Sequence, residues 1–379
     1  MKILFTGGGT GGHIFPIISI IREIRKTFPR ELVLNISFVG PKDQFSEIFF
    51  SQEGVQVKNI LSGKIRRYFT LISFFKNLVD VVFKIPLGIL QSFFYIFFWA
   101  PDLIFSKGGY GSIPVVLSGW LLRVPIILHE SDAMPGLTNR FLSRFAAAVF
   151  VSFPNTSYFP AKKTVLVGNP IRKEILNGSR EKGKAIFKLS GEKPIIFIAG
   201  GSQGAQRIND KILDILPELL KNFELLHQTG EKNFETVVAE SKIMISKEMA
   251  RYYHPVPFLD EEEMREAYAV SELIISRAGA STIFEIAAVG KPSILIPLPE
   301  AAQDHQLNNA YIYAQKGAAV VLEEENFTPR FFLERLKYLF SHPQILEKMS
   351  QASKEFAKPI ADQVIAKYIL TYCTRTAKE

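Results

Sequence analysis

One local pattern occurs twice in this chain, and it limits the folds that the chain can adopt. An apolar run, a glycine-rich turn and a helix-like segment follow one another in KILFTGGGTGGHIFPIISIIREIR, residues 2–25, and again in KPIIFIAGGSQGAQRIND, residues 193–210. After each occurrence, short apolar runs alternate with helical patterns, which is typical of a parallel sheet covered by helices. The sequence therefore predicts an α/β protein with two Rossmann-like, doubly wound domains in tandem.

Further apolar runs define the two predicted sheets. The strands predicted for the first half are residues 34–40, 102–109, 125–131, 147–153 and 164–170, and those for the second half are 223–230, 272–279, 292–299 and 317–324. We expect one domain over residues 1–168 and a second over 169–351, with a C-terminal helix at about 352–379 packing back on the first. The short linker at Gly168–Pro170 predicts that the domains face each other across a cleft, where ligands bind.

Composition limits the class of protein and its partners. The 379 residues are 47% hydrophobic and 22% charged, which excludes a disordered chain, and the formal net charge of +8 suggests an anionic partner. Nucleic acid, an acidic lipid surface and a phosphorylated ligand all meet that description. The single cysteine, Cys373, excludes an internal disulfide framework and a thiolate metal cluster. The apolar run before the first glycines is too short for a secretory signal.

The glycine-rich turns are candidate anion sites. Gly7, Gly9 and Gly12 match the spacing G-x-G-x-x-G between a predicted strand and a predicted helix, where backbone N–H groups can approach a phosphate. Related turns follow at residues 107–111, 200–204 and 278–282. In a doubly wound domain these turns lie at the carboxyl ends of strands, so a diphosphate is the ligand that they favour. The alternative is a set of tight turns whose hydroxyl residues only cap helices.

Other phosphate and nucleotide motifs are absent from the sequence. In a dinucleotide-binding fold, an acidic residue at the end of the second strand binds the ribose. Asp43 is a poor candidate for that role, because it lies beyond Gly40 and Pro41. No P-loop and no Asp-x-Asp pair occurs. We therefore expect no metal and no cofactor, and we expect backbone dipoles, hydroxyls and Arg172 to neutralise a diphosphate. On spacing alone, Arg172 is equally well explained as a surface residue.

Three titratable residues are candidates for roles in catalysis or binding. His13 follows the first glycine turn and is suited to removing a proton from a hydroxyl near neutral pH. Glu130, at the end of a predicted strand, is the rival base. Glu285 lies four residues past Ser281 in the first turn of its predicted helix. It can bind a ribose diol or simply add favourable charge at the helix N-terminus.

Residues 68–100 form an apolar region with one polar stripe. A helical pattern over 68–84 places Thr70, Ser73, Asn77, Asp80 and Lys84 on one narrow face, and a second run, 89–100, is apolar nearly all round. The basic residues just upstream are Lys64, Arg66 and Arg67. This pattern suits an anionic membrane interface, although two core helices covering the sheet fit it as well. The apolar run falls short of a membrane span, so we expect a soluble protein with part of this surface exposed.

Seven stretches, in this order, resemble the MurG family of peptidoglycan N-acetylglucosaminyltransferases over nearly the whole chain. They are GGGTGGHIFP, KGGYGSIPVVLSGW, HESDAMPGLTN, VGNPIR, GGSQGAQRIN, SRAGASTIFEIAAVGKP and AAQDHQLNNA. The resemblance implies the GT-B fold and inverting, metal-independent transfer of GlcNAc from UDP-GlcNAc to the C4 hydroxyl of MurNAc in lipid I, giving lipid II. It also implies a peripheral position on the cytoplasmic face of the membrane, other cell-wall synthesis proteins as partners, and no nucleic acid.

The resemblance also assigns residues. It implies that Thr10, Gly11 and Gly12 close on the substrates, that Arg172 and Ser202 contact the diphosphate, and that the Leu259 backbone contacts uracil. The segment Ala280, Ser281, Thr282, Ile283, Phe284 and Glu285 is implied to hold phosphate and ribose, with Glu285 on the ribose, and Gln306 to contact GlcNAc. His13 matches the residue proposed as base. The family usually has Asn where this chain has Asp132, which accepts a hydrogen bond from a sugar hydroxyl but does not donate one.

Other readings of the sequence remain open. A UDP-GlcNAc 2-epimerase or a glycolipid galactosyltransferase shares the expected fold, and UDP release with and without a lipid I analogue separates either one from a GlcNAc transferase that acts on lipid I. A non-catalytic membrane-bound scaffold predicts tight UDP-GlcNAc binding without turnover. An NAD enzyme fits least well, because the ribose carboxylate is lacking.

Overall fold

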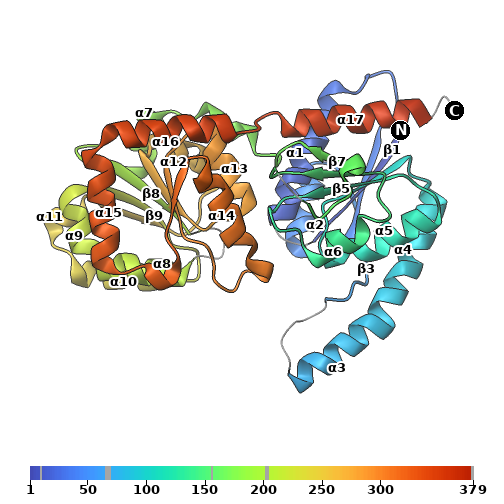
Figure 1. The fold of residues 1–379 in the computed structure, drawn as a ribbon, viewed down its shortest axis with the longest axis horizontal. Coiled ribbons are helices and arrows are strands. Elements are labelled where there is room, and N and C mark those ends of the chain that lie inside the picture. Colours follow the sequence, from blue (N-terminus) through green and yellow to red (C-terminus); the bar gives the residue numbers. More distant parts are fainter. Residues whose placement is uncertain (9–10, 65–69, 155–156, 201–204, 377–379) are drawn as a thin grey trace. The chain divides into compact units, whose positions relative to one another are not determined.

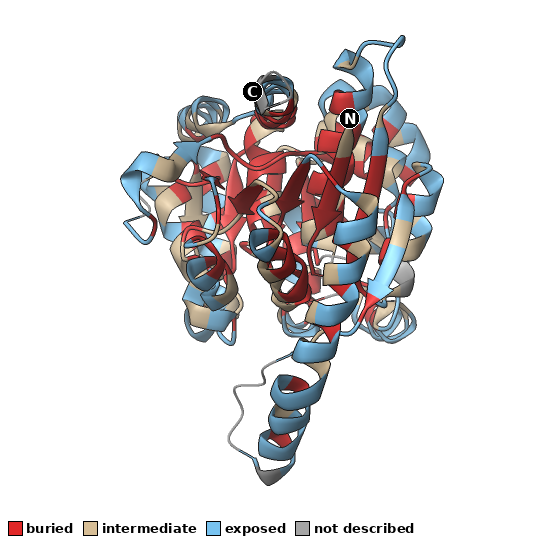
Figure 2. Ribbon diagram, turned by 90° about the vertical axis from the view of Figure 1, so that its right-hand side faces the viewer, coloured by how far each residue is buried: buried red, intermediate tan, exposed pale blue. Residues whose placement is uncertain are grey.

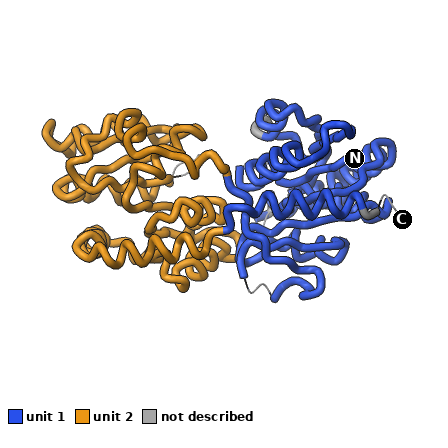
Figure 3. Tube along the Cα trace, turned by 90° about the horizontal axis from the view of Figure 1, so that it is seen from above, with its two compact units in different colours: residues 1–171, 358–379 blue, residues 172–357 orange. Residues whose placement is uncertain are grey.

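Both predicted parallel sheets are present in the computed structural model, which describes residues 1–379 apart from 9–10, 65–69, 155–156, 201–204 and 377–379. The chain forms two compact units, coloured separately in Figure 3. Unit 1 comprises residues 1–171 and 358–379, and unit 2 comprises residues 172–357. The boundaries expected from the sequence, at 168 and 351, lie a few residues before the two points where the chain passes between units.

The sheet of unit 1 has seven parallel strands in the order β3-β2-β1-β4-β5-β6-β7. The strands are β1 (Lys2–Thr6), β2 (Asn35–Pro41), β3 (Gln56–Ile60), β4 (Leu103–Ser106), β5 (Ile126–Glu130), β6 (Ala148–Val151) and β7 (Thr164–Leu166). The winding direction reverses between β1 and β4, which pair directly. Ligands of doubly wound sheets bind at such a reversal, beyond the carboxyl ends of the strands.

Alternate side chains of these strands enter two separate cores, which is why the strands read as continuous apolar runs. The helices of unit 1 are α1 (Gly11–Thr27), α2 (Gln44–Gln52), α3 (Leu71–Val79), α4 (Ile85–Trp99), α5 (Ile113–Leu121), α6 (Leu137–Leu142) and α17 (Ala361–Thr376). Ile3 and Phe5 pack with residues of α1, α2 and α17, whereas Leu4 packs with residues of α4, α5 and α6. Figure 2 shows the strands as the buried centre of this unit.

The last helix completes the first unit. Ile365 and Ile369 of α17 are fully buried in the same core as α1, and the ring of Tyr368 packs edge-on against Phe150 with centroids 5.0 Å apart. The Ser19 hydroxyl donates to Asp362 at 2.9 Å and to the Ile171 carbonyl at 3.0 Å. The two points where the chain leaves and re-enters unit 1 are thereby held by one serine.

Unit 2 repeats the topology with six parallel strands in the order β10-β9-β8-β11-β12-β13. The strands are β8 (Ile195–Ala199), β9 (Glu224–Gln228), β10 (Tyr253–Val256), β11 (Leu273–Ser276), β12 (Ser293–Leu295) and β13 (Ala319–Val321). The helices are α7 (Arg180–Phe187), α8 (Gln206–Asp214), α9 (Leu216–Asn222), α10 (Phe234–Met244), α11 (Lys247–Ala250), α12 (Glu261–Val270), α13 (Ala280–Val289), α14 (His305–Gln315), α15 (Pro329–Ser341) and α16 (Pro343–Phe356). The winding reverses between β8 and β11.

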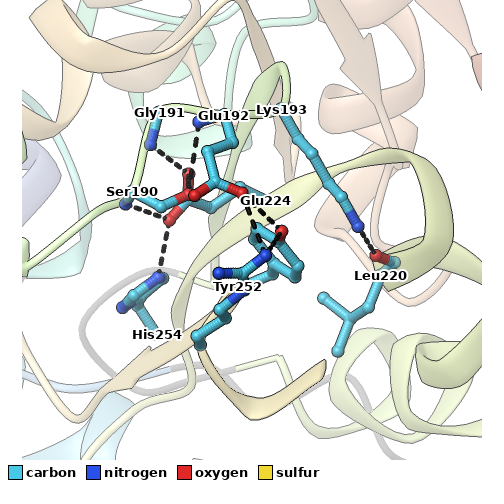
Figure 4. A network of polar contacts seen from close by, with 9 residues as sticks. Ser190, Gly191, Glu192, Lys193, Leu220, Glu224, Tyr252 and His254 are labelled. Carbon is cyan, nitrogen blue, oxygen red and sulfur yellow. Dashed lines mark hydrogen bonds and ion pairs between the residues drawn. The ribbon is translucent and has the colours of Figure 1, made fainter. Parts of the chain in front are cut away.

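A buried carboxylate organises the amino end of this second sheet (Figure 4). Glu224, the first residue of β9, accepts hydrogen bonds from the backbone N–H groups of Ser190 and Gly191, both at 2.7 Å. His254 Nε2 lies 2.9 Å from the same carboxylate. Because this network lies at the start of β9, it is at the opposite end of the strand from the ligand-binding edge. We therefore assign it to the stability of unit 2.

The apolar region forms one continuous helix, which differs from the two separate helices expected. α3 runs through a π-helical turn, Asp80–Lys84, into α4. In that turn the Ile85 N–H bonds to the carbonyl of Asp80, five residues back, and this local π geometry accommodates Pro86 inside the helix. By length and composition, residues Ile72–Trp99 could cross a membrane. The expectation that the apolar run is too short is therefore wrong.

The polarity of α3 is inverted relative to an ordinary surface helix. Ser73 and Asp80, on the polar stripe, are only 8% and 2% exposed, whereas Phe74, Phe75 and Phe83 are 57–63% exposed. Asp80 accepts from Lys84 Nζ at 2.6 Å and from the Lys64 backbone at 3.3 Å. Figure 2 shows how much of this helix is exposed. The chain thus covers Ser73 and Asp80 of the polar stripe and leaves the aromatic face of α3 and the following π-helical turn uncovered.

Candidate functional site

The reversal of winding in unit 1 brings two of the glycine-rich turns together. The turn after β1 leads into α1, and the turn after the neighbouring strand β4 begins at Lys107. Gly108 and Gly109 have φ angles of +85° and +80°, and a Cβ at Gly108 would lie 2.3 Å from Asn139 Oδ1. Only glycine fits there without strain. Each turn follows a strand, as the sequence predicted, and the pairing of β1 with β4 makes the two turns adjacent.

His13 lies between these two turns. A Cβ on Gly8 would lie 3.4 Å from the imidazole Cδ2, and one on Gly109 would lie 3.5 Å from Cε1. The residue is partly buried, and its Nδ1 atom is buried without a hydrogen-bond partner among the residues that the structure describes. Burial and the positive charge of Lys107 lower the pKa of His13 from 6.5 to about 4. The ring is therefore neutral at pH 7.

Of the neighbouring loop residues, Gly11 and Gly12 begin α1, whereas Thr10 lies outside the described residues. A Cβ at Gly12 would meet none of the described atoms within 4 Å. Packing against the described part of the chain therefore does not require glycine at position 12. The open space leaves the backbone N–H groups at the start of α1 accessible to a ligand.

Lys107 occupies the centre of this edge, and its chemistry was not anticipated from the sequence. Its side chain is 2% exposed. Its Nζ lies 2.6 Å from His129 Nδ1 and 2.6 Å from Ser131 Oγ. It also donates to Asn169 Oδ1 at 2.8 Å. Burial lowers the pKa of Lys107 from 10.5 to about 7, against the opposing effect of the carboxylates of Glu130 and Asp132.

Glu130, the rival base, holds the loop that follows β5. Its Oε1 accepts from the backbone of Asp132 at 3.0 Å. Its Oε2 accepts from Asn139 Nδ2 at 2.9 Å and from the Gly136 backbone at 3.2 Å. Burial and the nearby Asp132 carboxylate raise the pKa of Glu130 from 4.5 to about 7. Both carboxylate oxygens of Glu130 accept hydrogen bonds inside the protein. Glu130 therefore stabilises the loop that carries Asp132.

His129 is a fully buried neighbour in the same cluster. Its Nε2 lies 2.9 Å from the carbonyl of Gly168, while its Nδ1 faces Lys107. Because Nδ1 accepts from an ammonium and Nε2 faces a carbonyl, the ring proton is assigned to Nε2. Burial and the charge of Lys107 lower the pKa of His129 well below 6.5. His129 is therefore neutral. Its two ring contacts join the end of β5 to Lys107, after β4, and to Gly168, after β7.

The corresponding edge of unit 2 carries the predicted helix N-terminus. α13 begins at Ala280 after β11, and its N-cap residue, Gly279, makes no side-chain capping bond. Ile283 and Phe284 are at most 1% exposed, so their side chains belong to the core, whereas Ser281 and Thr282 are partly exposed. The backbone N–H groups of the first turn and the partly exposed hydroxyl residues lie on the side of this segment that faces away from the core, and a helix N-terminus is a favourable place for an anion. Ser202, in the turn after β8, lies outside the described residues.

Arg172 and Glu285 are bonded to each other. Arg172 Nε donates to Glu285 Oε1 at 2.7 Å, and its second nitrogen donates to Oε2 at 2.8 Å. The Tyr268 hydroxyl donates to the same Oε2 at 3.1 Å. Glu285 lies in the second turn of α13 and is 7% exposed, so the expected position in the first turn is wrong. The alternative of Arg172 as a surface residue is likewise wrong, because the bidentate pair is largely buried.

Leu259 and Gln306 both lie after the carboxyl ends of strands of unit 2, β10 and β12, which are not neighbours in the sheet. Leu259 follows β10 and is 2% exposed, so only its backbone is suited to contact a ligand. Gln306 is the second residue of α14, and its Oε1 accepts from the Leu298 backbone at 3.0 Å. The two residues before α14, Gln303 and Asp304, have φ angles of +58° and +52°. Such strained non-glycine residues cluster at functional sites, and no sequence signal indicated them.

Among the described residues, no group of three or more His, Cys, Asp and Glu side chains is arranged to hold a metal ion.

Comparison with known proteins shows similarity over the whole chain. The glycosyltransferase family 28 N-terminal domain matches residues 3–151, and the C-terminal domain of the same family matches residues 195–364. A Bacillus cereus protein named UDP-N-acetylglucosamine–N-acetylmuramyl-(pentapeptide) pyrophosphoryl-undecaprenol N-acetylglucosamine transferase 2 is 38% identical over 370 residues, which cover 97% of this chain and 99% of that protein.

Two solved structures are also similar. The crystal structure of Acinetobacter baumannii MurG aligns with a TM-score of 0.74 and 28% identity, covering 98% of this chain and 99% of that one. A UDP-GlcNAc 2-epimerase from Neisseria meningitidis aligns with a TM-score of 0.67 but only 14% identity, covering 98% of this chain and 100% of that one. The second likeness is one of fold alone.

Proposed function

The chain belongs to glycosyltransferase family 28, and from that premise we propose that it transfers GlcNAc from UDP-GlcNAc to the C4 hydroxyl of MurNAc in lipid I, producing lipid II for peptidoglycan synthesis. The observation that carries the proposal is the match of both domains to one family together with 38% identity to the Bacillus cereus transferase over nearly the full chain. The GT-B fold alone would leave the epimerase reading open, since that enzyme shares the fold at 14% identity.

In this proposal the edge of unit 2 binds the UDP moiety. The N-terminus of α13, with Ser281 and Thr282, takes the diphosphate, because a helix N-terminus attracts anions. Glu285 accepts from the ribose hydroxyls while Arg172 holds its carboxylate in place, and the Leu259 backbone contacts uracil. Gln306 contacts GlcNAc through its amide N–H₂, since its Oε1 already accepts from Leu298. Ser202 belongs to the same proposed set.

His13 is the proposed general base. Inversion takes place in one displacement, so the acceptor hydroxyl must lose its proton as the bond to UDP breaks. A neutral imidazole can take that proton, and His13 is neutral at pH 7 because its pKa is lowered to about 4. A base of such low pKa is weak, and the negative charge of a bound substrate diphosphate would raise it toward neutrality. Asp132 accepts from a sugar hydroxyl in place of the family's Asn.

The exposed aromatic face of α3 is the proposed membrane contact. A helix that covers its polar stripe and exposes Phe74, Phe75 and Phe83 suits the interior side of a lipid headgroup layer. Lys64, together with Arg66 and Arg67, which lie outside the described residues, would meet anionic lipids. The helix is about 42 Å long at about 1.5 Å per residue, enough to cross a bilayer core of about 30 Å.

Attachment to one face fits the structure of this helix better than a membrane span. Ser118 of α5 donates to the Ile89 carbonyl at 2.9 Å, and Ser92 and Ile96 are buried against unit 1. A Cβ at Gly88 would lie 1.9 Å from the Leu61 carbonyl oxygen, so the backbone is tightly packed there. Lipid cannot surround a segment that is packed against protein in this way. We therefore propose a peripheral enzyme on the cytoplasmic face of the cell membrane, where other cell-wall synthesis proteins are its further partners.

The decisive experiment measures UDP release from UDP-GlcNAc with and without a lipid I analogue, and the anomeric configuration of the product. We expect release that depends on the analogue and a β-linked disaccharide. Formation of UDP without an acceptor product, together with ManNAc, would establish the epimerase instead. Tight UDP-GlcNAc binding without turnover would establish a non-catalytic scaffold. UDP release with a glycolipid acceptor and UDP-galactose, but not with lipid I, would establish a galactosyltransferase.

A further inference from the structure

A buried lysine lies among the groups that surround His13, and none of the roles assigned so far uses it. Lys107 follows β4 at the reversal of winding, and its side chain is 2% exposed. An ammonium group has three N–H donors. The three contacts of Lys107 Nζ, at 2.6 to 2.8 Å, go to His129, Ser131 and Asn169. All three donors are thereby satisfied inside the protein, so Lys107 is built into the site and is not arranged to bind substrate itself.

The contacts of Lys107 connect the three segments that end at this edge. Its backbone begins the turn that packs against His13, since a Cβ on Gly109, two residues further on, would lie 3.5 Å from the His13 Cε1. Its ammonium fixes the ring of His129 at the end of β5, and that ring in turn faces the Gly168 carbonyl at 2.9 Å. It also holds Asn169, two residues before the chain leaves unit 1.

Four titratable groups around Lys107 interact with its charge. The carboxylates of Glu130 and Asp132 favour the ammonium form of Lys107. That same ammonium lowers the pKa of His13 and of His129, because it opposes a second positive charge nearby. In the opposite direction, the Asp132 carboxylate raises the pKa of His13. Burial makes the largest contribution to the lowered pKa of His13, and one positive and one negative neighbour adjust it further.

We propose that Lys107 is a positioning residue of the transferase: its buried ammonium fixes the orientation of His129 and Asn169, balances the charge of Asp132, and keeps the neighbouring His13 ring in its neutral, proton-accepting form. The role assigned to His13 as the base rests on the proposed function. The fixed orientation of His129 and the charge balance do not, because they concern the unliganded protein.

The test compares Lys107→Met, Asp132→Asn and the double variant with the wild type. Methionine keeps the length of the side chain and removes the charge. Lys163→Met is the matched control, because Lys163 is in unit 1 and its Nζ donates, within the described residues, to the Ala146 carbonyl at 2.8 Å. Two measurements are made on the full chain: NMR titration of the histidine rings without substrate, and kcat and KM for transfer to a lipid I analogue as a function of pH.

We expect Lys107→Met to raise the midpoint of His13 protonation by about 1 pH unit or more, the usual effect of removing a nearby charge. Asp132→Asn should lower it, and the double variant should fall between the two. The ¹⁵N shifts of His129 should report a proton on Nε2 in the wild type and a mixture of tautomers in Lys107→Met. In the assay, kcat of Lys107→Met should fall relative to the wild type only as the pH drops below about 5, approaching about 10-fold below about pH 4, with KM for UDP-GlcNAc unchanged. Lys163→Met should match the wild type.

Each result bears on the proposal. Unchanged His13 and His129 signals in a folded Lys107→Met protein would overturn it, and so would a fall in kcat that is equal at every pH. If Lys107→Met does not fold, the Asp132→Asn titration decides alone: a downward shift of the His13 midpoint supports the charge balance, and no shift overturns it. A wild type without transferase activity whose histidines titrate as expected would reject the proposed function and retain the positioning role.

Discussion

Arg172, the first residue of unit 2, forms a bidentate ion pair with Glu285 of α13, 113 residues further along the chain. The pair is largely buried, and Tyr268 donates to the same carboxylate. Glu285 is therefore held in one orientation before any ligand binds. A carboxylate fixed in this way can accept from a ribose diol without the entropy cost of ordering its side chain.

We expect Glu285→Gln to weaken UDP binding by about 1–3 kcal/mol, the usual cost of losing a hydrogen bond to a charged group. Glutamine removes the charge and one acceptor while keeping the size of the side chain. Tyr268→Phe is the control, because it removes the hydroxyl and leaves the ion pair intact, and its effect should be under about 1 kcal/mol. Isothermal titration with UDP measures both. Equal UDP affinity in Glu285→Gln and wild type would remove Glu285 from the nucleotide site.

His13→Ala should lower kcat by about 10²–10⁴-fold, the usual loss when a general base is removed, while UDP affinity changes little. The proposed UDP contacts are all in unit 2, which explains why binding should survive. Single-turnover assays with a lipid I analogue measure the effect. A loss of less than about tenfold in His13→Ala, combined with no turnover in Glu130→Ala, would assign the base to Glu130. Activity in both variants would leave the proton to water or a substrate phosphate.

The stability of the protein should depend on pH through Glu130. The pKa of this carboxyl is raised from 4.5 to about 7 in the folded state, so the folded protein binds more protons than the unfolded chain between those values. Its contribution to stability is complete below about pH 4.5 and is lost as the pH rises through 7. In Glu130→Gln this loss should disappear. Urea unfolding of both proteins between pH 4.5 and 8 checks the slope, and parallel curves would contradict the assignment.

Binding to lipid vesicles should depend on both the aromatic face and the basic segment. Changing Phe74, Phe75 and Phe83 to Ser should reduce binding to every vesicle, because the apolar face supplies the insertion energy. Neutralising Lys64, Arg66 and Arg67 should reduce binding to anionic vesicles and its sensitivity to salt. Ile243→Ser, at an 87% exposed position of unit 2, is the control and should have no effect. Equal binding of the wild type to neutral and anionic vesicles in sedimentation assays would exclude the electrostatic part.

Transfer should proceed in EDTA. Helix N-termini, with Arg172 close to Glu285, are expected to provide the positive potential that a metal ion supplies in other transferases. The measurement is UDP release in EDTA, with and without added Mg²⁺ or Mn²⁺. Complete loss in EDTA and recovery on adding either ion would show that a metal is needed.

Sequence patterns predicted the buried strands and two of the four edge strands, β7 and β13, but missed the other two. The central strands are apolar on both faces because helices cover both sides of the sheet. The outermost strands β3 and β10 were not predicted. β3, QVKNI, is polar and mostly exposed, and β10 contains Pro255, which a strand tolerates at a sheet edge. These two edge strands lack the apolar signal from which the others, including the edge strands β7 and β13, were found.

The same contrast holds for the site. The glycine turns were predictable, because their place after β1, β4 and β11 follows from the order of the strands. The pairing of Arg172 with Glu285, and the contacts of Lys107 with Asn169, join residues that are far apart in the sequence, and no spacing rule indicates them. The polar stripe of α3 was also found correctly. Which face it turns to solvent depends on the path of residues 61–64, and periodicity carries no information about that path.

The position of α17 has a consequence for synthesis on the ribosome. Ile365 and Ile369 complete the core of unit 1, yet about 190 residues of unit 2 are made between that core and its last helix. At about 5–20 residues per second, the delay is roughly 10–40 s. Unit 2 is translated as one uninterrupted segment, so it can fold while unit 1 still lacks a helix, whereas an N-terminal domain is usually complete before the next domain is made. A nascent chain in that interval exposes the α1 face that α17 later covers, and chaperones that recognise apolar surfaces have their longest access to it.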